Sequence, residues 1–143
     1  MTVNSIAPQI LMNTFIRTYQ HQVQHGHIVN ISSGAGKYAI EAWAPYCASK
    51  AAIDLYSETV HAELESRGKT NWFVHAIAPG VVDTVMQEEI RESDPDLFQS
   101  HEKFMALKAN QELVSPRIVA DKIMQVIASP RLFRKTTISV RDF

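Results

Sequence analysis

The chain has 143 residues, of which 45% are hydrophobic and 20% charged, and its formal net charge is -1. This composition is typical of one globular domain, and we expect residues 1–143 to form it. The balanced charge provides no basic surface for nucleic acid, and no stretch approaches the roughly 18 apolar residues of a membrane span.

The first predicted element is a helix over residues 4–24. Its apolar side carries Ile6, Ile10, Leu11, Phe15 and Ile16, and Gly26 is a plausible stop signal. A strand is expected next, over residues 27–32 (HIVNIS). Its apolar residues do not alternate strictly, which is typical of parallel strands that are covered on both faces.

A second helix is predicted from about Pro45, where a missing backbone N–H costs nothing, to Gly68. Its apolar repeat at a spacing of four consists of Ala52, Tyr56, Val60 and Leu64. The run WFVHAIA, residues 72–78, predicts the second buried strand.

A long polar segment, residues 85–111, follows this strand and has helical turns of its own with a break at Asp94–Pro95. We expect it to act as a lid over a site. A third helix is predicted with Ser115 as its N-cap, ending before Pro130, and with Val119, Ile123, Val126 and Ile127 on its buried face. Residues 136–140 (TTISV) predict the last strand.

Helices alternating with strands indicate an α/β fold with a doubly wound parallel sheet of the Rossmann type, here with about three strands and flanking helices. Ligands of such sheets bind outside the carboxyl ends of the strands. The amino-terminal stretch lacks the features of a signal peptide, so we expect a cytoplasmic protein. The single cysteine, Cys47, agrees with a reducing compartment and is interpreted as a small packed residue rather than a nucleophile.

The run SGAGKY, residues 33–38, suggests two phosphate-binding motifs that both fail. A P-loop requires a glycine at position 31 and Ser or Thr at position 38. A dinucleotide fingerprint matches Gly34, Gly36 and Ala39, but its acidic residue, Asp54, would fall inside a helix instead of at a strand end. The glycines are better explained by a loop that turns tightly or closely approaches a ligand.

The histidines do not form a convincing metal site. His21 and His25 have a helical spacing that could seat zinc, but no Cys, Asp or Glu nearby completes the ligand set, and His27 lies beyond the helix. We interpret this cluster as a solvated helix end. His61 and His75, like His101, are expected to be surface or packing residues.

One constellation remains. Ser33 follows the first strand, and Tyr46 comes thirteen residues later, four residues before Lys50 on the same face of a helix. The second strand leads into APGVVDT, residues 78–84, at the same expected sheet edge. A phenol with a pKa near 10 donates its proton reluctantly at neutral pH. An ammonium about 5 Å away would stabilise the phenolate by about 3 kcal/mol and so lower that pKa.

This combination resembles the short-chain dehydrogenase/reductase family. The family pattern is a serine at a strand end, then Tyr-x-x-x-Lys, then Pro-Gly-x-Ile-x-Thr after the next strand, with an asparagine early in the preceding helix. The matching positions here are Ser33, Tyr46, Lys50, Pro79, Gly80, Val82, Thr84 and Asn4. Within the family, the sequences of these segments are most similar to the sepiapterin reductase and benzil reductase branch.

The resemblance implies a carbonyl reductase that transfers a hydride between a nicotinamide cofactor and a small ketone or its alcohol. Tyr46 would be the general acid or base, Lys50 would assist it and hold the nicotinamide ribose, and Ser33 would orient the substrate oxygen. Asn4 would hold a water linked to Lys50. The nicotinamide carboxamide would meet Thr84 and the backbone around Val82, with Pro79 and Gly80 passing close to the ring. The cofactor would be NADP or NAD, with the branch slightly favouring NADP.

The match covers only the second half of the family pattern, because the chain has no glycine before Gly26 and so lacks the family's glycine-rich opening. We therefore expect a truncated product, in which the phosphates of a dinucleotide lack a binding loop. Two functions stay open. One is a reductase, and the other is a silent remnant that acts as a dimerising or binding module, since the family's usual homodimer interface uses the helices that hold Asn4 and Tyr46.

Overall fold

A three-stranded parallel sheet lies at the centre of the computed structural model, which describes residues 1–143. The strands are β1 (Gly26–Ile31), β2 (Trp72–Ala78) and β3 (Thr137–Ser139), and they are ordered β1-β2-β3. Both strand pairs are parallel. The predicted parallel sheet is thus confirmed, with β2 in its middle.

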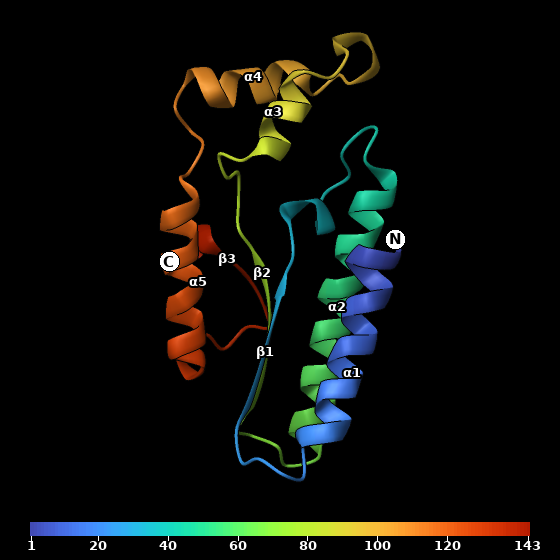
Figure 1. Cartoon of the computed structure of the whole chain (residues 1–143), viewed down its shortest axis with the longest axis vertical. Helices are drawn as coiled ribbons and strands as arrows, with labels where there is room; N and C mark the ends of the chain where they lie inside the picture. Colours follow the sequence, from blue (N-terminus) through green and yellow to red (C-terminus); the bar gives the residue numbers. More distant parts are fainter.

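Helices cover both faces of this sheet. Figure 1 shows α1 (Ala7–Tyr19) and α2 (Ala44–Ser66) on one side and α5 (Pro116–Ala128) on the other. This is the doubly wound arrangement that the sequence predicts. No helix combines the length and the apolar character that crossing a membrane requires.

Shorter helices complete the chain. Two of them, α3 (Val85–Arg91) and α4 (His101–Ala109), lie beyond the carboxyl end of β2 (Figure 1). The remaining turns are η1 (Thr2–Ile6), η2 (Gly34–Gly36), η3 (Pro95–Leu97), η4 (Pro130–Leu132) and η5 (Val140–Asp142). The polar segment 85–111 therefore has the helical turns expected of it.

The central strand β2 is buried on both faces. Trp72 and Val74 point into a core that α1 and α2 cover, with Ile53 and Leu64 of α2 among its members. Ile77 points the other way. It packs with Val119 and Val126 of α5 and with Ile138 and Val140 near the carboxyl end of the chain. Burial on both sides explains why the sequence of β2 is apolar without alternation.

Helix α5 follows its sequence signals closely. The side chain of Ser115 accepts a hydrogen bond from the backbone N–H of Ile118 at 3.4 Å, so it is the N-cap that the sequence predicts. Val119 and Val126 are buried, and Ile123 is partly buried against them. Ile127, predicted to be buried, is instead 43% exposed because it lies at the margin of the face that meets the sheet.

Helix α1 departs from the prediction in its length and in its buried face. It ends at Tyr19, and the residues it buries are Met12 and Ile16. Most of the predicted apolar side is exposed, with Ile10 at 60% and Leu11 at 68%. The sheet ends at β1, so no further strand lies beneath this part of α1 to cover it.

Gly26 is the first residue of β1 rather than a helix stop. A Cβ atom at this position would lie 2.4 Å from the indole ring of Trp72, its partner residue on β2. The glycine is therefore required by the close approach of the Trp72 ring. Its helix-stopping role in the sequence analysis is wrong.

Candidate active site

Four segments meet at the carboxyl ends of β1 and β2. They are the turn after β1, the first turns of α2, the turn η1 and the segment 79–84 after β2. Both η1 and η2 contact α2, and the lid helices α3 and α4 stand over the same end of the sheet (Figure 1). Ligands of parallel α/β sheets bind at this edge, so we take it as the candidate site.

Ser33 lies in the turn where β1 passes into η2. Its extended backbone makes it the N-cap of η2, and its Oγ accepts a hydrogen bond from the backbone N–H of Ala35 at 3.2 Å. The hydroxyl uses its oxygen in this bond, which leaves its own hydrogen free to donate to another acceptor. The turn thereby fixes Ser33 without occupying its donor.

Tyr46 and Lys50 lie in the first turns of α2 and contact each other. The Lys50 ammonium lies over the Tyr46 ring, 5.6 Å from the ring centroid, within the range of a cation–π interaction. The spacing of four predicts this proximity. Lys50 also reaches back across the sheet edge, because its Nζ donates to the carbonyl oxygen of Ile31 at 2.8 Å.

The surroundings of Lys50 disfavour its charge only in part. Partial burial lowers the pKa of the ammonium from its ordinary value, and the carboxylate of Asp54 opposes that shift. The residue is only half-buried, so the ammonium still meets solvent. Of its three N–H donors, the structure assigns one to Ile31, and the other two have no protein partner.

Asn4 lies in the π-helical turn η1, which packs against α2. Its side chain is exposed and forms no hydrogen bond with another protein group. The structure therefore brings Asn4 to the helix of Tyr46 and Lys50 but joins it to neither by a direct contact.

The segment after β2 is held by backbone pairing. Val82 bridges to Val114, and the N–H of Asp83 donates to the Val114 carbonyl at 2.9 Å. Thr84 begins α3 as its N-cap residue, and its Oγ1 donates to the Val82 carbonyl at 3.3 Å. These bonds fix the segment at the edge of the sheet.

Gly80, within the same segment, has a φ of 79°, a conformation that favours glycine. A Cβ atom there would lie 3.2 Å from Nε of Arg141. Pro79, just before it, is partly buried. The chain thus turns in a way that the Pro-Gly sequence permits.

An aromatic cluster joins the lid segment to α2. The ring of Trp43, just before α2, stacks on Phe98 with a centroid distance of 5.7 Å and an interplanar angle of 6°. Trp43 also contacts Phe104 of α4 at 5.5 Å and the edge of Tyr46 at 5.7 Å. A salt bridge of 2.8 Å between Lys108 and Asp83 adds a second link. The lid therefore packs directly beside Tyr46, and the sequence analysis did not identify Trp43.

One glycine of the SGAGKY run, Gly36, allows a close approach to helix α2. A Cβ atom at Gly36 would lie 2.8 Å from Oδ2 of Asp54 and 3.0 Å from the carbonyl carbon of Lys50, whereas Gly34 has open space. Gly36 thus lets η2 contact α2. The glycines thus lie in a tight turn, as predicted, and the close approach at Gly36 is to α2 rather than to a ligand.

His27 and His75, predicted to be solvated and surface or packing residues, form a pair on the α5 face of the sheet. His27 Nε2 lies 2.8 Å from His75 Nδ1, and His75 Nε2 donates to the Phe133 carbonyl at 2.9 Å. Burial lowers the pKa of His27 to about 4, His75 adds to this, and the Ile127 carbonyl opposes it. Burial also lowers the pKa of His75. The sequence held one sign of this burial, because each histidine lies in a predicted buried strand.

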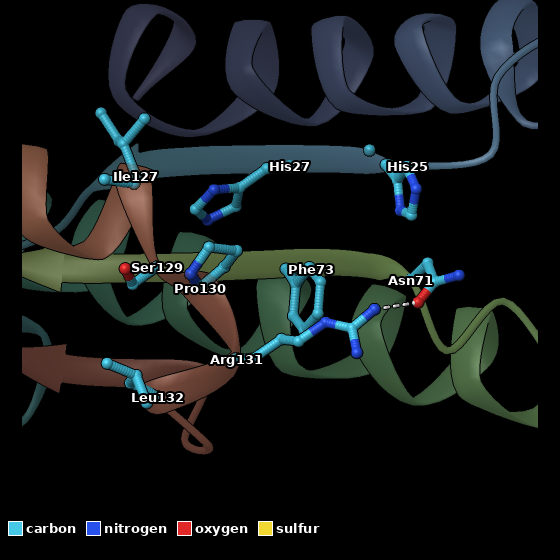
Figure 2. A pocket seen from close by; sticks show the side chains of 11 residues that line it. His25, His27, Asn71, Phe73, Ile127, Ser129, Pro130, Arg131 and Leu132 are labelled. Atoms are coloured by element: carbon cyan, nitrogen blue, oxygen red, sulfur yellow. Dashed lines mark hydrogen bonds between the residues drawn. The ribbon is translucent and has the colours of Figure 1, made fainter.

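A pocket at the opposite end of the sheet has no part in the candidate site. Figure 2 shows His25 and His27 on one side of it and Arg131 on the other, where Arg131 Nη2 donates to Asn71 Oδ1 at 2.5 Å. It lies by the amino ends of β1 and β2. No group of three or more His, Cys, Asp or Glu residues in the structure could hold a metal ion.

The residues present fit one end of a nicotinamide dinucleotide. Lys50 keeps two N–H donors for ribose hydroxyls, and Gly80 and Thr84 provide a closely passing backbone and a hydroxyl at the same edge. They lie at the carboxyl edge of a parallel sheet with helices on both faces, which is where dinucleotides bind in such folds.

Comparisons with known proteins identify the family of this chain. A family model described as short chain dehydrogenase matches residues 1–95, which is more than half of the chain. The chain is 38% identical to a benzil reductase ((S)-benzoin forming) of Bacillus cereus over 125 residues, and 35% identical to the sepiapterin reductase of Bos taurus over 106 residues. The chain therefore belongs to the short-chain dehydrogenase family.

These relatives are longer than the chain. The Bacillus match covers 87% of this chain and 50% of the benzil reductase, and the bovine match covers 73% and 37%. A solved short-chain dehydrogenase/reductase from Saccharomyces cerevisiae matches with a TM-score of 0.74 and 25% identity, over 90% of this chain and 52% of its own. A 4-hydroxyisoleucine dehydrogenase mutant, solved with NADH and succinate, also gives a TM-score of 0.74, with 29% identity over 96% of this chain and 54% of its own. The chain spans about half the length of the curated relatives it matches.

Proposed function

We propose that this chain carries the proton-transfer site of a carbonyl reductase that uses NADP or NAD. In the proposed reaction Tyr46 gives its phenolic proton to the oxygen of a small ketone, and takes it back when the alcohol is oxidised. The observation that carries the proposal is the contact of Lys50 with both the Tyr46 ring and the Ile31 carbonyl at the carboxyl end of β1. Family membership adds support.

Ser33 would bind the substrate oxygen. Its oxygen accepts from the backbone N–H of Ala35, and its hydroxyl hydrogen has no acceptor within the protein. A donor fixed in this way can orient a carbonyl toward Tyr46 and stabilise negative charge as it develops on the oxygen.

Lys50 would have two functions. Its positive charge stabilises the phenolate that remains when Tyr46 has lost its proton. Its two N–H donors without a protein partner suit the ribose hydroxyls of the cofactor. We propose that Asn4, on the turn that packs against α2, holds a water through which Lys50 exchanges protons with solvent.

The bound cofactor would supply the hydride. We propose that Thr84 and the backbone at Val82 hold its carboxamide, and that Pro79 and Gly80 allow the chain to pass close to the ring. The pairing of Val82 with Val114 keeps this segment in place. The sequence resemblance to the benzil and sepiapterin reductase branch slightly favours NADP, whereas the 4-hydroxyisoleucine dehydrogenase mutant of similar fold was solved with NADH.

We propose a small ketone or diketone as the substrate class, with the lid 85–111 shaping its pocket. The names of the relatives, benzil reductase and sepiapterin reductase, support this class. The contact of Trp43 with both Tyr46 and the lid residue Phe98 gives such a pocket an aromatic wall. We also propose a cytoplasmic location, on composition and on the single free cysteine, Cys47.

The test is to mix the purified chain with NADPH or NADH and benzil, and to follow the absorbance of the reduced nicotinamide. We expect turnover, and a loss of at least about 100-fold in the Tyr46→Phe variant because the proton donor is removed. Tyr38→Phe is the matched control, since Tyr38 is 71% exposed and should leave turnover unchanged.

Binding is measured separately, as the rise in melting temperature on adding nucleotide. A small rise is expected, because this chain provides no glycine-rich loop for the phosphates. Absence of both nicotinamide oxidation and any nucleotide-induced rise in melting temperature would contradict the proposed activity of this chain.

The exposed apolar residues of η1 and α1 favour a second candidate, a dimerising module. Val3, Ile10 and Leu11 are each at least 60% exposed, next to the helix that carries Tyr46. We propose that two copies associate through α1 and α2. Sedimentation of Leu11→Glu against the control Arg117→Glu, an exposed residue of α5 on the opposite face of the sheet, tests this: we expect Leu11→Glu to be monomeric and the control to remain dimeric. A monomeric wild-type chain would contradict it.

A further inference from the structure

Tyr46 and Lys50 share their face of α2 with a third polar residue, Asp54, one turn further on. Its carboxylate lies between α2 and the turn that follows β1. Oδ2 lies close to Gly36, since a Cβ atom there would lie 2.8 Å from it. Asp54 therefore touches the same short turn that carries Ser33.

The other carboxylate oxygen, Oδ1 of Asp54, is buried and forms no hydrogen bond. The hydroxyl oxygen of Ser32 is also buried and lies beside this carboxylate, where it favours the charged form, although no hydrogen bond of normal geometry joins the two groups. Buried polar groups without partners cost folding free energy, so a native protein needs a reason to keep them. Packing alone does not provide that reason, because an apolar residue would pack without this cost.

The charges around Asp54 come from two elements. Burial raises the pKa of Asp54, and the Glu58 carboxylate on α2 adds to this; the Ser32 hydroxyl and the ammonium groups of Lys37 and Lys50 oppose it. Seen from Lys50, Asp54 is the carboxylate that favours its positive charge against burial. No salt bridge joins the two side chains, and we expect them to interact at longer range, one turn apart on the same face of α2.

We propose that Asp54 is a positioning residue of the active site, whose carboxylate holds the Ser33 turn against α2 and supports the charge of Lys50. It does not touch the reacting atoms. Through the turn it sets where Ser33 presents its hydroxyl, and through Lys50 it acts on Tyr46. This rests on the proposed reductase function for its catalytic meaning, but the coupling itself can be measured without turnover.

The first test compares Asp54→Asn with the control Asp121→Asn, an exposed aspartate on α5. The Lys50 ammonium is titrated by NMR in chains with 13C-labelled lysine, and its signal is assigned by its loss in Lys50→Arg. We expect the Lys50 pKa to fall by roughly 0.5–1 unit in Asp54→Asn, as for the loss of a nearby opposite charge, and to stay unchanged in Asp121→Asn. An unchanged Lys50 titration in Asp54→Asn would overturn the proposal.

The reciprocal measurement does not depend on the folding of Asp54→Asn. In Lys50→Gln the carboxyl of Asp54 should titrate at higher pH than in the wild type, because a stabilising positive charge is lost.

The melting temperature of Asp54→Asn should be equal to or above that of the wild type at pH 7. A fall of many degrees would make Asp54 a structural group and would also overturn the proposal.

Turnover separates this proposal from the proposed function. If the wild type oxidises NADPH with benzil, Asp54→Asn should lower kcat about three- to tenfold, because the turn that presents the Ser33 hydroxyl is less well fixed, with KM for benzil little changed. If the wild type shows no turnover, the reductase proposal fails for this chain, and the two titrations still decide whether Asp54 and Lys50 are coupled.

Discussion

The paired histidines His27 and His75 make the stability of the chain depend on pH in a defined window. In the folded chain His75 Nε2 donates to the Phe133 carbonyl, so His75 Nδ1 is the acceptor for His27. This arrangement needs no positive charge, and burial lowers the pKa of His27 to about 4. The unfolded chain binds a proton at this histidine near its ordinary pKa of 6.5.

Between pH 6.5 and about 4 the unfolded state therefore binds more protons than the folded state, and stability falls as the pH falls. One pKa unit corresponds to about 1.36 kcal/mol, which gives about 3.4 kcal/mol for this shift without screening. Because His27 is only partly buried, solvent screening reduces the expected loss to about 1–2 kcal/mol. Removing the titrating ring should remove this loss.

The assay is urea unfolding of the wild type, His27→Gln and the control His21→Gln at several pH values from 7 to 4. Gln at position 27 keeps an N–H donor for His75 but does not titrate, so the free energy of unfolding of His27→Gln should fall less with acid, by about 1–2 kcal/mol. His21 is exposed, and His21→Gln should follow the wild type. Parallel curves for wild type and His27→Gln would refute the reasoning.

Three further outcomes are expected. Gly36→Ala should destabilise the chain by about 1–3 kcal/mol, because its Cβ would lie 2.8 Å from Asp54, whereas Gly34→Ala, in open space, should leave chemical denaturation nearly unchanged. Trp43→Ala should speed limited proteolysis of the lid segment, because the stacking that holds it is lost. Cleavage at the wild-type rate would contradict this. Lys108→Met should change the free energy of unfolding by less than about 1 kcal/mol, since its salt bridge is exposed; a larger loss would contradict this.

Local signals in the sequence were sufficient for most of the sheet. Strand β2 has the predicted limits, and β1 lies one residue from its predicted position, because both are apolar runs bounded by turn residues. The last strand is shorter than predicted, since Val140 already begins the turn η5. The register of the strands and the face of α1 that is buried depend on which elements are neighbours, and periodicity does not reveal this.

In the candidate site, too, contacts within one helix could be predicted from the sequence, and contacts between elements could not. The contact of Lys50 with Tyr46 follows from a spacing of four in a helix, so the sequence could predict it. Two other contacts join residues that are far apart in the sequence. His27 and His75 are separated by 48 positions, and Trp43 and Phe98 by more than that. Such contacts arise from the packing of whole elements, and one sequence gives no direct sign of them. The roles of the eight site residues remain predictions until the variants are measured.

The close approach of Gly26 and Trp72 limits how this chain can change during evolution. Any side chain at position 26 collides with the indole ring, which a Cβ atom would approach within 2.4 Å. A smaller residue at position 72 would have to appear first, and it would leave a cavity in the core that costs about 3–5 kcal/mol. Each single step is therefore unfavourable, and we expect the two positions to be inherited together among descendants of this sequence.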